Sequence, residues 1–107
     1  MSVLKSINPT TEELYAEFKE INLSTAEQII EKSSNAQLVW SNVDIEKRSK
    51  IILEIGSFLK TNKRSYAEII TNEMGKPITE AIGEIDKCVW LCEYYAENAS
   101  KFLGDQH

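Results

Sequence analysis

Two cysteines, Cys88 and Cys92, carry the most reactive side chains in this sequence. They lie four positions apart, so that on a helix both thiols would share one face, one turn from each other. Such a pair could form a disulfide, bind a metal ion or provide a reactive thiol. We favour a fourth interpretation, two small apolar residues on a buried helix face. A metal site would need further ligands, and no histidine accompanies the two cysteines. The one histidine, His107, is the last residue, and we expect it to have no catalytic role.

Paired carboxylates are the second chemical candidate. Glu80 and Glu84 lie one helical turn apart, and so do Glu93 and Glu97. Such pairs do acid–base chemistry when the two carboxyl groups have different environments. Lysines stand near both pairs along the chain, so we interpret the pairs as a solvated helix face. The sequence therefore indicates no catalytic residue and no metal ligand.

The glycines offer no site for a phosphate group. All four are isolated, so neither a dinucleotide-binding glycine pattern nor a phosphate-binding loop can be written from them. Gly75-Lys76 resembles the end of a phosphate-binding loop, but Pro77 stands where Ser or Thr is needed. We therefore predict that no residue of this chain binds a cofactor.

The composition is that of one small acidic domain of 107 residues. Hydrophobic residues make up 42% and charged residues 27%, which argues against a wholly disordered chain. The net charge of −5 argues against nucleic acid and against an anionic membrane as partners. We find no signal peptide and no apolar stretch of bilayer length, and we expect a cytoplasmic location.

Alternation and helical periodicity predict a mainly α chain with an N-terminal β-hairpin. Residues 1–21 are expected to be extended, with a turn at Asn8-Pro9-Thr10-Thr11. Ser24-Thr25-Ala26-Glu27 fits a capping box, and Asp44 is the next plausible N-cap. Gly75 follows a helix end as a C-terminal glycine should. The expected helices span residues 24–41, 44–61, 63–74 and 78–103.

The last expected helix has an unusually wide apolar stripe. Trp90, Leu91 and Tyr94 flank the inward positions, so that more than half of the circumference is apolar. Such a helix needs neighbours on several sides, which indicates that the chain is part of something larger. The alternative is a compact four-helix bundle in which these residues cover the core. The inward candidates are Ala81, Ile82, Ile85, Cys88, Val89, Cys92, Tyr95, Ala96, Ala99 and Phe102.

Several stretches resemble the aldehyde dehydrogenase superfamily. The family opening INPATGE is similar to residues 7–13, INPTTEE, and its pattern E-x-GKP-x-x-EA-x-GE is similar to residues 73–84, EMGKPITEAIGE. The family passage W…ERA…L is similar to Trp40, Lys47-Arg48-Ser49 and Ile52-Leu53. Tyr94-Tyr95-Ala96-Glu97 with Phe102-Leu103 resembles the succinate-semialdehyde dehydrogenase-like branch. The resemblance covers nearly all of the chain.

One residue departs from the family pattern. Glu12 stands where the family usually has glycine, which puts the tight turn at this place in doubt.

The resemblance implies the N-terminal segment of an enzyme that oxidises an aldehyde, such as succinate semialdehyde, to the acid with NAD or NADP. In that family a cysteine thiolate attacks the carbonyl carbon, hydride passes to the nicotinamide, and a glutamate activates water. The nucleophile, the base and the Rossmann core come after residue 104 in the usual order. The chain is then part of the α/β aldehyde dehydrogenase fold with the Rossmann core missing, and inactive by itself.

The resemblance also implies one place in a substrate site. Aligning the last helix on Tyr94-Tyr95 puts Lys87 and Leu91 on the side that borders the family's substrate tunnel. A positive Lys87 at the mouth would suit an acidic semialdehyde. The alternative for this pair is a surface lysine and a packing leucine.

Two kinds of partner follow from the family resemblance. The chain is expected to bind the remainder of a dehydrogenase subunit, or to self-associate through exposed apolar helix faces. The rival hypothesis is a stand-alone, non-catalytic helical module that binds a full-length dehydrogenase subunit.

Overall fold

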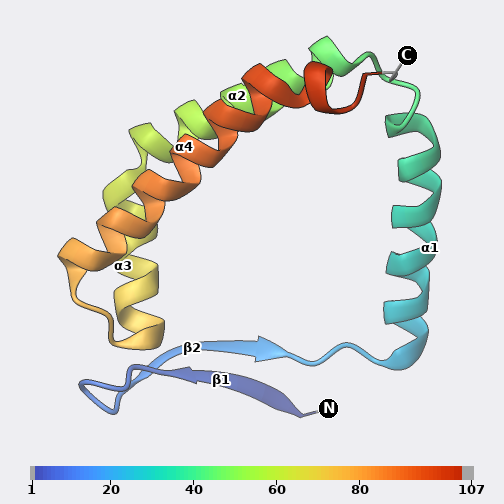
Figure 1. The fold of residues 1–107 in the computed structure, drawn as a ribbon. Helices are drawn as coiled ribbons and strands as arrows, with labels where there is room; N and C mark the ends of the chain where they lie inside the picture. Colours follow the sequence, from blue (N-terminus) through green and yellow to red (C-terminus); the bar gives the residue numbers. More distant parts are fainter. Residues whose placement is uncertain (1, 105–107) are drawn as a thin grey trace.

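The computed structural model describes residues 2–104. A hairpin of β1 (Val3–Ile7) and β2 (Leu14–Lys19) comes first, and four helices follow: α1 (Leu23–Trp40), α2 (Ile45–Thr61), α3 (Lys63–Met74) and α4 (Ile78–Phe102). Figure 1 shows an open arch, with α2, α3 and α4 together on one side, α1 apart on the other, and the hairpin across the base. A hairpin followed by four helices is the fold class that the sequence predicts.

The two strands of the hairpin run antiparallel. Val3 lies opposite Lys19 and Leu4 lies opposite Phe18, and the register shifts between Ser6 and Ile7. Side chains alternate between the faces of a strand, so Leu4 and Phe18 share one face. Both are exposed, which leaves an apolar pair on this face without cover from the described residues.

The turn of the hairpin depends on one asparagine and one left-handed residue. The Asn8 Oδ1 atom accepts hydrogen bonds from the main-chain N–H groups of Thr10 at 2.9 Å and Thr11 at 3.2 Å. The Asn8 carbonyl oxygen accepts a third from the Glu12 N–H group at 2.8 Å. Glu12 has a φ of 63°, the left-handed region that favours glycine. The tight turn therefore forms although Glu12 replaces the family's glycine.

Replacing Glu12 with glycine is expected to raise the free energy of unfolding by about 0.5 kcal/mol. Glycine removes the steric cost of the left-handed conformation, and its greater freedom in the unfolded chain offsets part of that gain. The matched control is Glu13→Gly, because Glu13 is not among the residues with positive φ, and this variant should lose stability. Urea unfolding of both variants measures the difference; a Glu12→Gly variant less stable than the parent chain would contradict the expectation.

Helix α1 begins earlier than expected, with a different cap. The Asn22 Oδ1 atom accepts a hydrogen bond from the Thr25 N–H group at 2.8 Å, so Asn22 is the N-cap. The capping box expected at Ser24 is therefore wrong, because Ser24 already lies inside the helix. Asparagine caps at least as well as serine, so the helix begins at the asparagine two residues before Ser24.

The junction between α3 and α4 follows the predicted pattern. Gly75 has a φ of 73° and its N–H group donates to the Thr71 carbonyl oxygen, which is the expected C-terminal glycine. The hairpin turn packs directly on this glycine, since a Cβ atom built on Gly75 would lie 2.8 Å from Pro9 Cγ. Asn8 also donates a side-chain hydrogen bond to Asn72 at 3.4 Å. These contacts fix the base of the arch to one end of the helices.

The core of the molecule lies where α4 packs on α2 and α3. Ala67 of α3 and Ala81 and Ile85 of α4 form its buried centre. Gly56 of α2 is also buried, and a Cβ atom built on it would lie 2.9 Å from the Cβ atom of Cys92. The missing side chain at Gly56 therefore allows α2 and α4 to approach closely.

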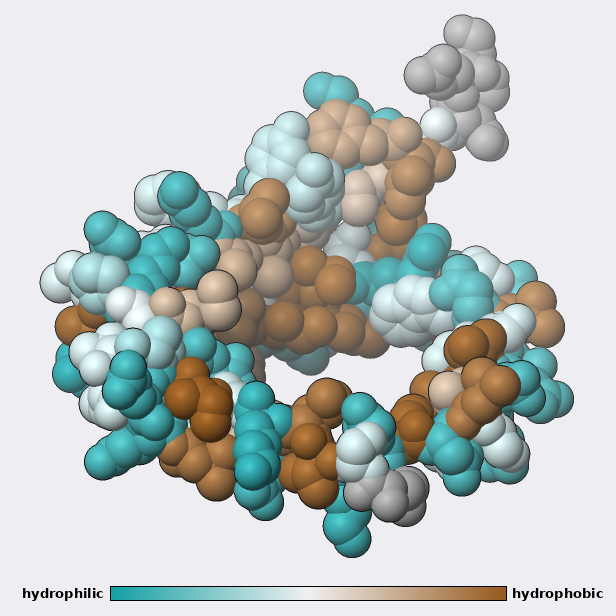
Figure 2. Space-filling model, turned by 90° about the horizontal axis from the view of Figure 1, so that it is seen from below, coloured by the Kyte–Doolittle hydropathy of each residue, from teal (hydrophilic) through white to brown (hydrophobic). Residues whose placement is uncertain are grey.

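The overall shape contradicts the compact four-helix bundle. The radius of gyration is 18.3 Å, against about 13 Å for a compact domain of this length. Helix α1 has no buried residue. Figure 2 shows an open space framed by the hairpin and the helices, with hydrophobic side chains gathered along its walls. No helix in residues 2–104 is long and apolar enough to cross a bilayer.

Candidate functional site

The two cysteines of α4 are free thiols with different surroundings. Cys88 is exposed, and Cys92 is half-buried beside Gly56 of α2. The buried face expected for both is therefore wrong for Cys88. The physical reason is that α2 and α3 cover a narrower sector of α4 than its apolar stripe predicts. Two other inward candidates, Tyr95 and Phe102, are exposed for the same reason.

The described residues hold no metal centre. Within residues 2–104, no group of three or more His, Cys, Asp or Glu side chains lies close enough to bind a metal ion. His107 lies outside the described residues.

Two of the five acidic side chains of α4 form ion pairs. Glu84 lies 3.2 Å from the Lys76 Nζ atom, and Asp86 lies 2.7 Å from the Lys63 Nζ atom. Glu80, Glu93 and Glu97 are exposed. The interpretation as a solvated face agrees with this arrangement, and the Lys63–Asp86 pair ties the start of α3 to α4.

Lys87 and Leu91 lie one turn apart on the exposed surface of α4. Neither residue lines the two hollows described below. Their role at a substrate tunnel stays a prediction, which depends on the protein that would cover this face of α4.

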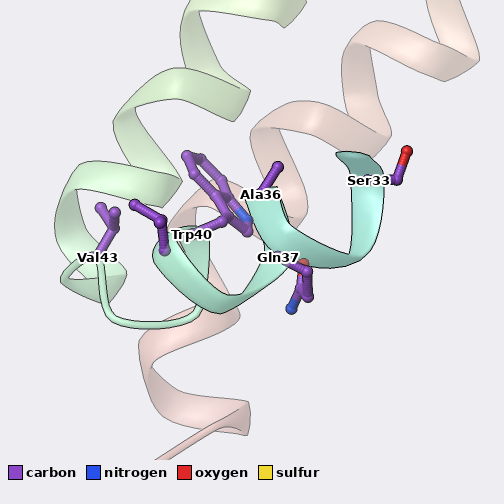
Figure 3. A pocket seen from close by; sticks show the side chains of 6 residues that line it. Ser33, Ala36, Gln37, Trp40 and Val43 are labelled. Atoms are coloured by element: carbon purple, nitrogen blue, oxygen red, sulfur yellow. The ribbon is translucent and has the colours of Figure 1, made fainter. Parts of the chain in front are cut away.

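An open hollow lies at the end of α1. It measures about 610 Å³, and we call it the α1 hollow. Figure 3 shows the Trp40 ring extending from the last turn of α1 toward the neighbouring helices, while Ser33 points away from it. The walls are mainly apolar and contain no nucleophile paired with a base. The lining residues are Ser33, Ala36, Gln37, Val39, Trp40 and Val43.

A smaller hollow is also lined by Trp40. It measures about 200 Å³, and we call it the corner pocket. Two polar atoms of its lining residues, Arg48 Nε and Ser49 Oγ, are buried and have no hydrogen-bond partner. Because both groups can donate a hydrogen bond, the pocket is suited to an acceptor oxygen. The lining residues are Trp40, Ile45, Arg48, Ser49, Ile52, Tyr95 and Ala99.

The sequence contains a signal for the corner pocket outside the motifs described above. Arg48 comes three residues after Ile45 and four before Ile52, so these three residues share one face of α2. A charged residue between two apolar ones on the same face indicates a polar group inside an apolar contact. The pocket itself requires Tyr95 and Ala99 of α4, whose proximity no local pattern predicts.

Comparison with known proteins decides the family. Residues 2–107 match the aldehyde dehydrogenase family along the whole stretch. The chain belongs to this family. It is 35% identical over 98 residues to a probable succinate-semialdehyde dehydrogenase [NADP(+)] of Sinorhizobium fredii, a match that covers 92% of this chain and 20% of that protein. It is 34% identical over 102 residues to the mitochondrial succinate-semialdehyde dehydrogenase of Arabidopsis thaliana, covering 95% and 19%.

A solved structure of the same family has the same fold over this stretch. The succinic semialdehyde dehydrogenase of Streptococcus pyogenes, solved in complex with NADP+, superposes with a TM-score of 0.87 at 32% identity. The match covers 92% of this chain and 22% of that one. This aldehyde dehydrogenase chain therefore spans about a fifth of the length of the relatives it matches.

The described residues of this aldehyde dehydrogenase chain do not fit a dinucleotide cofactor. Doubly wound folds hold the pyrophosphate at a glycine-rich turn between a parallel strand and the start of a helix. Within residues 2–104, the strands form one antiparallel hairpin whose turn, Asn8 to Glu13, contains no glycine. Residues 2–104 therefore form no pyrophosphate site of this kind.

Proposed function

We propose that this chain is the N-terminal part of an NAD(P)-dependent aldehyde dehydrogenase subunit and that it frames the rest of that subunit. The observation that carries the proposal is the family match over residues 2–107, which spans about a fifth of the relatives. The open arch supports it, because apolar residues on several elements are exposed around a central space (Figure 2). A large contiguous apolar surface is a marker of a protein contact.

Catalysis itself is expected to require the rest of the subunit. The described residues place no group of three or more His, Cys, Asp or Glu side chains around Cys88 or Cys92. The proposed role of this chain is to complete the fold that holds the catalytic residues. The two free thiols agree with a reducing compartment, so we propose the cytoplasm as its location.

The proposal is tested by completing the enzyme. The completing chain is the part of the Sinorhizobium fredii relative that follows its matched fifth. Alone, neither chain should reduce NADP+ in the presence of succinate semialdehyde; mixed, they should. Activity of this chain alone would contradict the proposal. Binding to the intact relative, but not to the completing chain, would instead favour the stand-alone interaction module.

Succinate semialdehyde is the substrate that we propose. The support is that relatives named for it match nearly all of this chain, and that Lys87 offers a positive charge one turn from Leu91. A lysine at the mouth of the site would attract the carboxylate end of the aldehyde.

Replacing Lys87 with methionine in the completed enzyme should raise the KM for succinate semialdehyde about threefold, the loss expected for an exposed charge pair. The KM for the uncharged aldehyde propanal should not change. Lys101→Met, in the last turn of α4, is the matched control and should affect neither substrate. Equal changes for both aldehydes would contradict a role of Lys87 in recognising the carboxylate.

A further inference from the structure

The corner pocket contains two buried polar groups without hydrogen-bond partners. Arg48 Nε and Ser49 Oγ are buried, and neither has a partner in the described residues. A buried polar group without a partner is destabilising, and natural structures rarely keep one without a reason. Both atoms belong to consecutive residues of α2 that line one small pocket. The lack of hydrogen-bond partners is therefore shared by two neighbouring groups of the pocket and is not confined to one side chain.

The chemistry of the two groups defines what would satisfy them. The Arg48 Nε–H group only donates, and the Ser49 hydroxyl can donate or accept. The lining residues include no Asp or Glu, so no carboxylate of the pocket neutralises the guanidinium. The occupant must therefore bring an acceptor oxygen. The remaining walls, among them Trp40, Ile52 and Tyr95, require that the group beside this oxygen be apolar.

We propose that the corner pocket receives a main-chain carbonyl oxygen from the rest of the dehydrogenase subunit, with an apolar side chain beside it against Trp40. This inference rests on the proposed function and names the point at which that partner is anchored. The chain spans only about a fifth of its relatives, so a large amount of polypeptide is available to cover this end of the arch. Every residue of a polypeptide has a main-chain carbonyl oxygen, and at apolar residues this oxygen lies next to an apolar side chain.

The larger hollow beside the pocket supports a polypeptide over a free small molecule. Trp40 lines both the α1 hollow and the corner pocket, so the two hollows share this side chain. The α1 hollow has mainly apolar walls and is about three times larger, at about 610 Å³ against about 200 Å³. A peptide segment crossing both would place apolar side chains in the first and one carbonyl group in the second.

Two variants separate an anchor from a merely structural residue. Ser49→Ala removes a buried hydroxyl that has no partner in this chain alone, so the isolated chain should melt at a higher temperature. The same variant should bind the completing chain more weakly. A higher melting temperature together with a lower affinity identifies Ser49 as an anchor for the partner. A serine with a merely structural role would instead lower both the melting temperature and the affinity when it is replaced.

Arg48→Lys tests the guanidinium, and Lys50→Met on the exposed side of the same turn is its matched control. The Kd for the completing chain, measured by titration calorimetry, should rise about tenfold for Arg48→Lys and stay unchanged for Lys50→Met. Circular dichroism checks that each variant is folded. If Arg48→Lys and Ser49→Ala both bind like the parent chain, the anchor is overturned while the proposed function stands.

Two further outcomes would overturn the inference in distinguishable ways. Failure of the unmodified chain to bind the completing chain would remove the proposed function and the anchor together. Saturable binding of acetate to the isolated chain, seen as a shift of the Arg48 Nε–H resonance, would identify the pocket as a site for a free carboxylate. We expect no such shift with acetate, and a downfield shift of that resonance on adding the completing chain.

Discussion

Replacing Gly56 with alanine is expected to lower the free energy of unfolding by about 1–3 kcal/mol. The added Cβ atom would lie 2.9 Å from the Cβ atom of Cys92, which is closer than two non-bonded carbon atoms approach. One of the two helices must therefore move, and α2 and α4 would separate along their contact. Val89 lies one turn before Cys92 on α4 and is buried, and its carbonyl oxygen would lie 3.7 Å from the added Cβ atom. The separation would therefore also loosen the core around Val89.

The matched control for this substitution is Gly83→Ala. Gly83 lies in the interior of α4, and a Cβ atom built there meets no atom within 4 Å. Alanine favours the helix over glycine by about 0.8–1 kcal/mol, so this variant should be more stable than the parent chain. Urea unfolding followed by circular dichroism measures both. A Gly56→Ala variant that matched the Gly83→Ala variant would show that α2 and α4 do not cross as closely as described.

The isolated chain is expected to self-associate as its concentration rises. Trp90, Leu91 and Tyr94 have exposed fractions of 65%, 54% and 51%, and they adjoin one another on α4. Large exposed apolar patches are usually buried in contacts with another protein. In a pure solution, the only such protein is a second copy of this chain. Sedimentation velocity at increasing concentration should show dimers and larger species.

Two additions make the sedimentation experiment specific. Trp90→Ser should shift the distribution toward monomer, whereas the neighbouring Glu93→Ser should not. Adding the completing chain should replace the mixture with one complex of defined size. A single monomeric species at every concentration would argue that the exposed apolar faces of α4 need no partner.

The helices of this chain could be predicted largely from the sequence because their end signals are local. Gly75 ends α3 through its left-handed conformation, and Pro77 keeps the next helix from joining it. The start of α1 shows the limit of such signals. Asn22 and Ser24 both favour a cap, and the sequence alone does not rank two good caps two residues apart.

The arch and its pockets could not be predicted in the same way. Periodicity identifies which face of a helix is apolar, but it does not identify the partner of that face. The prediction that Cys88 is buried failed because α4 has a wide apolar stripe and, within residues 2–104, packs mainly on α2 and α3. Trp40, Arg48 and Tyr95 meet through tertiary packing between three helices, which no local pattern encodes.

Helix α1 reports whether this chain frames the rest of an aldehyde dehydrogenase subunit. No residue of Leu23–Trp40 is buried, so its amide hydrogens should exchange quickly in the isolated chain. We predict that hydrogen–deuterium exchange across residues 23–40 becomes slower when the completing chain is added, because that chain covers α1. Unchanged exchange in α1, in a mixture where the two chains are in contact, would contradict the account.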